Sequence, residues 1–249
     1  MAMQRVIGVL SGKGGVGKTV TAINLSAALH QFGFDTTVVD ADISSANLTV
    51  HLGLPDATVS LQDVLDGKAH LYKAIRVVPK GLRIIPSSLS LEKTSADMSK
   101  LKKVIRGSLE GITIIDAPPG FSDQTNDIMD ACDDILIVTN PDVPSVTDAV
   151  KVTEISKRKG KNALGIVVTR LENSKIEVMA SEIGALCELP ILAEIPEDKS
   201  VKKSIYERVP LVFNSPYSDA AIGYKKLAAL IAGVPYSPPA MLALRRLFG

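Results

Sequence analysis

One short segment, Gly12–Thr19, constrains the fold of this chain more than any other, and it reads G-K-G-G-V-G-K-T. It matches the phosphate-binding pattern G-x-x-x-x-G-K-[ST], with an apolar run before it and a helical pattern after it. Residues without Cβ let consecutive backbone N–H groups converge on a polyphosphate, and a helix N-terminus adds partial positive charge. The segment therefore predicts a nucleotide phosphate loop between a strand and a helix; a bland glycine-rich turn is the alternative.

The chemistry of this loop predicts ATP or ADP with Mg²⁺ as its ligands. Lys18 should neutralise the β- and γ-phosphates, and the Thr19 hydroxyl should bind the metal. The nucleotide contacts expected from the loop and the first helical turn involve Gly12, Lys13, Gly14, Gly15, Val16, Gly17, Lys18, Thr19 and Val20.

Short apolar runs alternate with helical patterns along the rest of the chain. The expected strands are Val6–Ser11, Thr36–Asp40, Leu82–Pro86, Ile112–Asp116, Ile135–Thr139, Leu164–Thr169 and Ile191–Ile195. The expected helices are Val20–Phe32, Lys100–Leu109, Val146–Lys159, Ile176–Leu186 and Asp219–Ala232. Continuous Val/Ile/Leu runs are typical of strands buried on both faces, so we expect an α/β fold, a three-layer doubly wound, mostly parallel sheet flanked by helices. Gly233–Pro239 breaks the pattern, which divides the chain into a domain over 1–232 and a linker with a C-terminal segment over 233–249.

Composition excludes several function classes. Net charge is +1, so no global field draws the chain to nucleic acid. The two cysteines, Cys132 and Cys187, form no C-x-x-C pair, and we interpret them as structural. The basic run Lys157–Lys161 is interpreted as a solvated helix end, with DNA contact as the alternative. Met1–Arg5 has no secretory signal, and no apolar run approaches the roughly 18 residues of a membrane span. We therefore expect a cytoplasmic protein.

Three aspartates follow apolar strands at the sheet edge that should also carry the loop. Asp40 and Asp42 have the period-2 spacing that points both to one side of an extended chain. One could support the metal while the other orients an attacking water. Asp116 ends its strand before A-P-P-G and should reach the Mg²⁺ shell. The alternatives are a helix cap for Asp42 and a strand-end cap for Asp116.

The last segment, Ser237–Gly249, reads as a capped short helix with an apolar face and basic flanks. Such a helix suits an anionic membrane surface, and docking on the chain's own core or on a partner protein is the alternative. The residues expected to contact the membrane are Met241, Leu244, Arg245, Arg246, Leu247 and Phe248.

Several segments together resemble a known family. The second lysine in K-G-G-x-G-K-[ST] resembles the deviant Walker A motif of the MinD/ParA superfamily. D-A-D-I and D-A-P-x-G are most similar to archaeal-type MinD proteins, and the R-R-L-F-G ending resembles the MinD membrane-targeting sequence. The resemblance implies a slow P-loop ATPase that forms a homodimer on binding ATP. It would associate peripherally with the cytoplasmic face of the membrane and position division or motility machinery. Cargo and activating partner stay unknown, and nucleic acid is disfavoured.

The same resemblance implies roles for individual residues. Lys13 would act catalytically across the dimer, with a solvated lysine as the alternative. Asp42 would position the attacking water, and Asp40 would support the metal site. The segments expected to flank the adenine contribute Asn140, Arg170, Pro196 and Glu197. Pro119, Thr169 and Val20 depart from the family pattern.

Three other functions remain open at this stage. A ParA-type DNA-partitioning ATPase would use the same chemistry with a different partner. An iron–sulfur carrier would require paired cysteines, and a non-hydrolysing nucleotide-gated scaffold would show no turnover.

Overall fold

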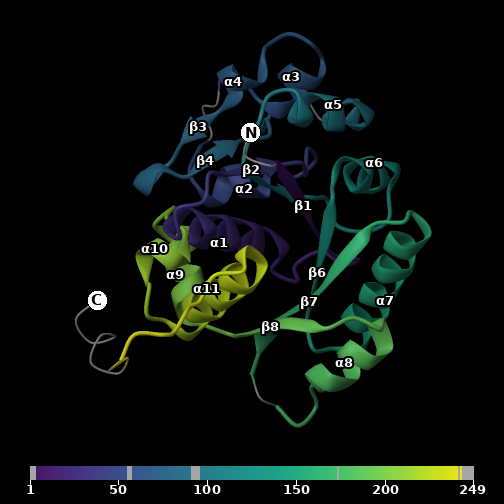
Figure 1. The fold of residues 1–249 in the computed structure, drawn as a ribbon, viewed down its shortest axis with the longest axis vertical. Helices are drawn as coiled ribbons and strands as arrows, with labels where there is room; N and C mark the ends of the chain where they lie inside the picture. The colour runs from purple at the N-terminus through teal and green to yellow at the C-terminus, as the bar shows by residue number, and fades with distance from the viewer. Residues whose placement is uncertain (1–3, 55–57, 91–95, 173, 241, 243–249) are drawn as a thin grey trace.

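The structure is a computed structural model that describes residues 4–54, 58–90, 96–172, 174–240 and 242. Within these ranges, eight strands form one sheet in the order β3-β4-β2-β5-β1-β6-β7-β8 (Figure 1). Every neighbouring pair is parallel except β3 with β4, which is antiparallel. The strands are β1 Arg5–Leu10, β2 Thr36–Asp40, β3 Arg76–Val77, β4 Arg83–Ile85, β5 Ile112–Asp116, β6 Asp134–Thr139, β7 Asn162–Leu171 and β8 Ile191–Pro196.

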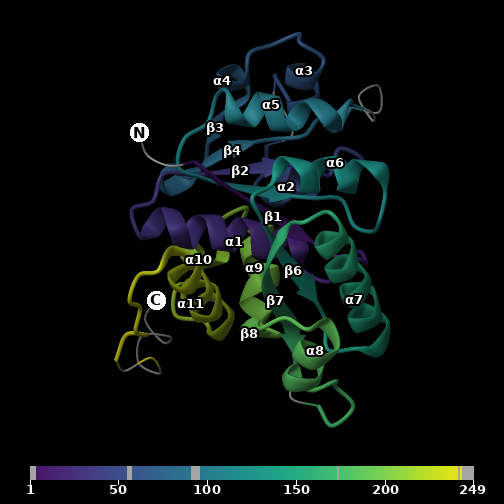
Figure 2. The same ribbon diagram turned by 45° about the vertical axis from the view of Figure 1, so that its right-hand side comes forward.

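Helices cover both faces of this sheet, as the α/β prediction requires. The α-helices are α1 Lys18–Gln31, α2 Asn47–His51, α3 Leu61–Leu65, α4 Leu71–Ala74, α5 Leu101–Arg106, α6 Asp123–Ala131, α7 Val143–Arg158, α8 Ala180–Cys187, α9 Lys199–Tyr206, α10 Leu211–Asn214 and α11 Asp219–Ala232. Figure 2 shows α1, α10 and α11 on one side of the sheet and α7 and α8 on the other.

The two-sided burial explains why the strands lack polar alternation. Val6 packs into the core cluster beneath α5, α6, α7 and α8, whereas its neighbour Ile7 packs into the cluster beneath α1 and α11. Val38 and Val39 divide in the same way. Since successive side chains of a strand point to opposite faces, both positions must be apolar.

All seven expected strands are present, and β3 is an additional one. The expected helix Ile176–Leu186 is wrong at its start, because α8 begins at Ala180. The Glu177 carboxylate accepts the backbone N–H groups of Glu172 and Ser174 and holds this stretch as a turn. The Glu182 carboxylate then accepts Met179 N–H at the helix start.

Several helices were not predicted from sequence, among them α6 and α9. Each of these two has a side-chain cap: Ser122 accepts Thr125 N–H before α6, and Asp198 accepts Ser200 N–H before α9. A polar residue directly before a helical segment is the N-cap signal that could have found both.

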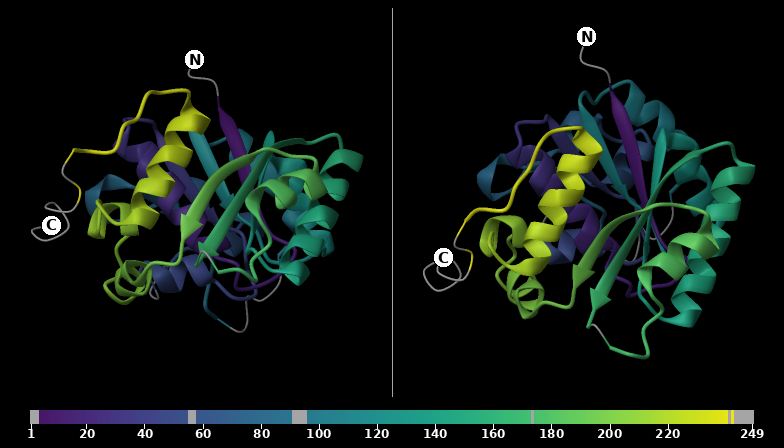
Figure 3. Two further views of the ribbon diagram at one scale, coloured as in Figure 1. Left: turned by 90° about the horizontal axis from the view of Figure 1, so that it is seen from below. Right: turned by 60° about the horizontal axis from the view of Figure 1, so that its bottom comes forward.

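A linker follows α11, and the domain boundary at residue 232 stays a prediction. Gly233 adopts φ 67 and ends α11, and the linker then continues away from that helix (Figure 3). The Tyr236 ring lies 5.7 Å from the Phe32 ring at the end of α1. In the part of the chain that is described, no helix is long and apolar enough to cross a bilayer.

Candidate nucleotide site

The predicted phosphate loop joins β1 to α1 at the carboxyl edge of the sheet. Gly15 and Gly17 have φ 81 and 85, a backbone conformation that a side chain disfavours. A Cβ on Gly15 would meet no atom within 4 Å, so the loop leaves open space there. A Cβ on Gly12 would lie 2.5 Å from the Asp148 Cβ, so this glycine allows close packing against α7. The loop therefore has the backbone geometry of a phosphate cradle.

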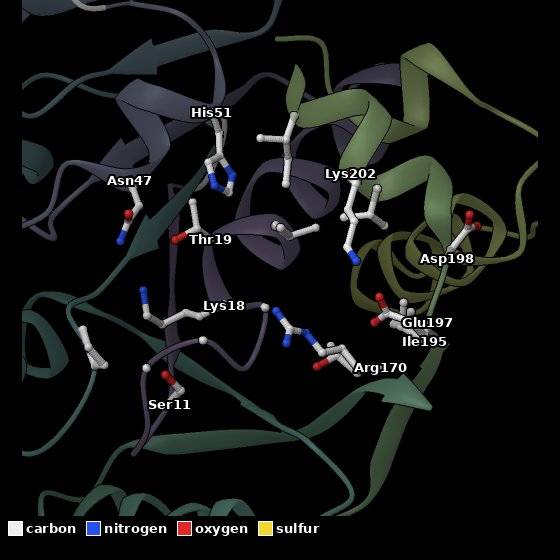
Figure 4. Close-up of a pocket in the computed structure, with 18 of the residues that line it drawn as sticks. Ser11, Lys18, Thr19, Asn47, His51, Arg170, Ile195, Glu197, Asp198 and Lys202 are labelled. Atoms are coloured by element: carbon white, nitrogen blue, oxygen red, sulfur yellow. The ribbon is translucent and has the colours of Figure 1, made fainter. Parts of the chain in front are cut away.

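A cavity of about 370 Å³ opens directly in front of this loop (Figure 4). Most of the residues that the sequence singled out line it: Lys13, Gly14, Gly15, Gly17, Lys18, Thr19, Val20, Asp42, Arg170, Pro196 and Glu197. Others lie behind the surface: Gly12, Val16, Asp40, Asp116 and Asn140 do not line the cavity. The size is that of a site for one small-molecule ligand.

Lys18 and Asp116 form a buried ion pair at the base of the cavity, with Nζ donating to Oδ1 at 2.7 Å. Asp40 lies directly beside Asp116, because β2 and β5 pair in parallel with these two residues in register. Thr49 of α2 donates its N–H and its hydroxyl to Asp40 Oδ2. Two carboxylates and one lysine thus share a space without solvent.

The arrangement leaves carboxylate oxygens unused. Among the described residues, Oδ1 of Asp40 and Oδ2 of Asp116 are buried without a hydrogen-bond partner. Burial, and then the charge of Asp116, raise the pKa of Asp40 to about 7. Unpaired buried carboxylate oxygens are ligands that suit Mg²⁺, so the donor chemistry of Asp40 and Asp116 fits the metal.

The Asp42 carboxylate is held within its own loop. It accepts the Ser44 hydroxyl at 2.8 Å and the Ser45 N–H at 3.3 Å, and Asn47 donates to it at 3.4 Å. Ala46, which follows, has φ 45, a conformation that costs a non-glycine residue free energy. Local strain at a loop that faces the cavity is typical of a segment that changes shape with its ligand.

Lys13 lies at the mouth of the cavity, and its side chain is half exposed. Its Nζ is 3.9 Å from Asp142 Oδ1, in a loose pair that solvent screens. The lysine is therefore directed away from the base of the cavity that Lys18 occupies.

The expected base contacts divide into two groups. Arg170, Pro196 and Glu197 line the cavity at the ends of β7 and β8, and Arg170 has φ 58. Asn140 lies behind them, where its Oδ1 accepts the Thr169 hydroxyl at 3.0 Å. Asn140 thus reaches the cavity wall through Thr169, and its contact with the base stays a prediction.

Sequence reasoning missed a second set of lining residues. Asn47 and His51 come from α2, Val201, Lys202 and Ile205 from α9, and Tyr224 from α11. The α2 residues follow D-A-D-I by four and eight positions, and the α9 residues follow Glu197 by four, five and eight, so extending each segment by about two helical turns would have found them. Tyr224 had no local signal.

The two cysteines and the basic run at the end of α7 have structural surroundings in the described part of the chain. Cys132 and Cys187 are buried and free, and burial raises the pKa of Cys132 to about 12. Lys157, Arg158 and Lys159 end α7 and pair with nearby carboxylates. The residues predicted to contact the membrane, Met241, Leu244, Arg245, Arg246, Leu247 and Phe248, lie outside the described residues.

Comparison with known proteins adds a consistent picture. Residues 2–232 match the family described as ParA: NUBPL iron-transfer P-loop NTPase. The chain is 39% identical to an ATP-binding protein of Methanocaldococcus jannaschii, over 94% of this chain and 90% of that protein. The septum site-determining protein MinD of Pyrococcus horikoshii, complexed with Mg-ADP, superposes with a TM-score of 0.87 at 34% identity, covering 92% of this chain and 96% of that one. The cell division ATPase MinD of Pyrococcus furiosus gives 0.88 at 35%, covering 93% and 99%.

Proposed function

The chain belongs to the ParA family of P-loop NTPases, among MinD-like ATPases that use ATP and Mg²⁺, and from this we propose a nucleotide-driven membrane cycle. ATP and Mg²⁺ bring two copies of the chain together, the dimer binds the cytoplasmic face of the membrane peripherally, and slow hydrolysis releases it. The cycle positions cell-division or motility machinery. Residues 1–232 form the ATPase domain, and 233–249 form the linker and the membrane-targeting segment.

The residues of the cavity support the ATPase chemistry. The loop amides and Lys18 hold the phosphates, and Lys18 exchanges its Asp116 partner for them. Thr19, Asp40 and Asp116 would hold Mg²⁺, which would supply positive charge beside the phosphates. Asp42 leaves its loop partners to orient the attacking water. Arg170, Pro196 and Glu197 contact the base.

The observation that carries the dimer proposal is the position of Lys13. A lysine inside the phosphate loop that points to the mouth of the cavity cannot serve the same function as the buried Lys18. Across a dimer, it would reach the phosphates of the partner and stabilise charge that develops during hydrolysis.

Dimerisation would also set membrane affinity. A single short amphipathic helix binds marginally, since four large apolar side chains offer roughly 4–6 kcal/mol before the cost of ordering the segment. Two helices in one dimer gain avidity of about 10²–10⁴ without any new contact.

Liposome sedimentation tests the cycle directly. Wild-type protein with ATP and Mg²⁺ should pellet with anionic vesicles, whereas with ADP it should stay in the supernatant. Lys13→Ala should lose the ATP-dependent pelleting and the ATP-dependent dimer seen by light scattering. Deleting Pro239–Gly249 should leave the dimer intact and abolish pelleting.

Two results would contradict this proposal. Unchanged pelleting of the truncated chain would remove the role of the C-terminal segment. An ATP-dependent, salt-sensitive shift of DNA without vesicle binding would instead favour a DNA-partitioning ATPase. Iron transfer is not proposed, because both cysteines of the chain are buried.

A further inference from the structure

One polar side chain in the nucleotide cavity has no function assigned so far. His51 is the last residue of α2, and its ring points into the cavity above Thr19 (Figure 4). Among the described residues the imidazole has no hydrogen-bond partner. A polar ring that faces a ligand cavity and has no partner within the described residues is available to hydrogen-bond a group of the ligand.

The surroundings of the ring restrict what that group is. His51 also borders a smaller hollow between α1 and α9, where Val20, Ile23 and Ile205 present apolar atoms. Burial lowers the pKa of His51. The ring is therefore neutral near pH 7 and carries one N–H donor, with one acceptor nitrogen.

The position of the ring along the cavity indicates which part of the nucleotide it meets. Lys18 marks the terminal-phosphate end, and Arg170 and Glu197 mark the opposite end, beside β7 and β8 (Figure 4). Val20, which borders the same two hollows as His51, lies in the first turn of α1, where backbone N–H groups bind phosphate. In a mononucleotide, the α-phosphate and the ribose lie between the terminal phosphates and the base.

We propose that His51 is a nucleotide-contacting residue whose ring N–H donates a hydrogen bond to a ribose oxygen of the nucleotide. The contact fixes α2 over the first turn of α1. It is made with ADP and ATP alike, because both contain this part of the molecule.

The contact has a consequence for the loop that precedes α2. Thr49, two residues before His51, donates to Asp40, and Asp42 lies at the start of the same loop. The C-terminal end of α2 packs closely against the residues after α9, because a Cβ on Gly53 would lie 2.3 Å from Arg208 Cδ. Nucleotide of either kind therefore anchors the C-terminal end of this segment, and only its N-terminal end remains free to respond to the γ-phosphate.

Isothermal titration of the full chain with Mg-ADP tests this inference, independently of dimerisation and membrane binding. His51→Leu should weaken ADP about tenfold, equivalent to about 1.4 kcal/mol. Inorganic pyrophosphate, which lacks the nucleoside, should displace a fluorescent ADP analogue from the phosphate loop with unchanged affinity. His30→Leu is the matched control, since His30 contacts the Lys80 carbonyl and does not line the cavity. It should bind ADP like the wild type.

Hydrogen exchange supplies a second measurement. ADP should slow amide exchange in Leu48–Leu52 in the wild type but not in His51→Leu. His51→Asn keeps a hydrogen-bond donor and should recover part of the ADP affinity. It replaces the leucine variant in the test if that variant does not fold. ADP affinity of both variants within twofold of wild type would overturn the proposal, and so would an equal loss for ADP and pyrophosphate.

Discussion

At the scale of single residues, the site depends on charges that are buried before any ligand arrives. Lys18 balances Asp116, whereas the Asp40 carboxylate accepts the two donor groups of Thr49 and pairs with no cation among the described residues. A buried carboxyl without a cation is expensive to ionise, so it keeps its proton to a higher pH. The buried Asp40 carboxyl therefore lowers the free energy of unfolding of the metal-free protein at the place where Mg²⁺ is expected.

This cost should appear in the pH dependence of the unfolding free energy of the metal-free protein. The pKa of Asp40 rises from 3.8 to about 7 on folding, so within this window the folded chain holds a proton that the unfolded chain has lost. Stability contributed by this group is full below the lower value and is lost as the pH rises through the window. The wild type should lose stability between about pH 5 and about pH 8, and Asp40→Asn should lose roughly 2 kcal/mol less over the same range.

Urea denaturation in chelator, with each protein measured at both pH values, checks this expectation. The amide oxygen that Asp40→Asn introduces can still accept hydrogen bonds from Thr49, so the variant should fold. Equal slopes of stability against pH for the wild type and Asp40→Asn would contradict it.

At the scale of elements, the carboxyl edge of the sheet is shaped by irregularities in the strands. β7 shifts register against β6 between Ile135 and Leu136, and Gly165 in β7 has φ 150 beside that shift. A Cβ on Gly165 would lie 2.5 Å from the Pro190 carbonyl oxygen and 2.7 Å from Leu192 Cγ. The glycine therefore lets β8 pair with β7 closely enough to bring Pro196 and Glu197 to the cavity.

Substitutions at two glycines distinguish the cost of backbone strain from the cost of steric overlap. Gly160→Ala places a Cβ at φ 65 in open space and should cost roughly 1 kcal/mol. Gly165→Ala adds contact with backbone that cannot move aside and should cost roughly 3 kcal/mol or more. Chemical denaturation measures the unfolding free energy of both variants. Equal losses of unfolding free energy would show that β8 moves to accommodate the added Cβ.

At the scale of the whole molecule, the boundary after residue 232 is not a clean one. Val234 N–H donates to the Ala229 carbonyl, and the Tyr236 ring packs near Phe32. The linker is therefore attached to the sheet domain over its first residues. A membrane-targeting segment that begins beyond this attachment would start from a defined place on the surface.

Two truncations locate the functional boundary. Ending the chain after Pro238 should leave ADP affinity and unfolding free energy unchanged, because the contacts of Val234 and Tyr236 remain. Ending it after Gly233 should cost roughly 1 kcal/mol through loss of the ring contact. Denaturation and calorimetry on both proteins check this, and a large loss from the first truncation would place the C-terminal segment within the folded core.

Local signals in the sequence determined the phosphate loop, the seven main strands and the five long helical patterns, apart from the start of α8. Each of these depends on neighbours within a few residues: glycines beside a lysine, continuous apolar runs, and a glycine at the end of α11. The aspartates at the strand ends were found for the same reason, because apolar runs stop directly at Asp40 and Asp116.

The tertiary structure alone decided which of these residues meet. Asp40 lies beside Asp116 because the sheet order places β2 next to β5, and no local pattern encodes that order. Lys18 reaches Asp116 across 98 positions of sequence, and His51 faces the cavity because α2 is wedged between α1 and the end of α9. Such contacts are selected by the packing of the whole core, since their free energy is gained only when distant elements are buried together.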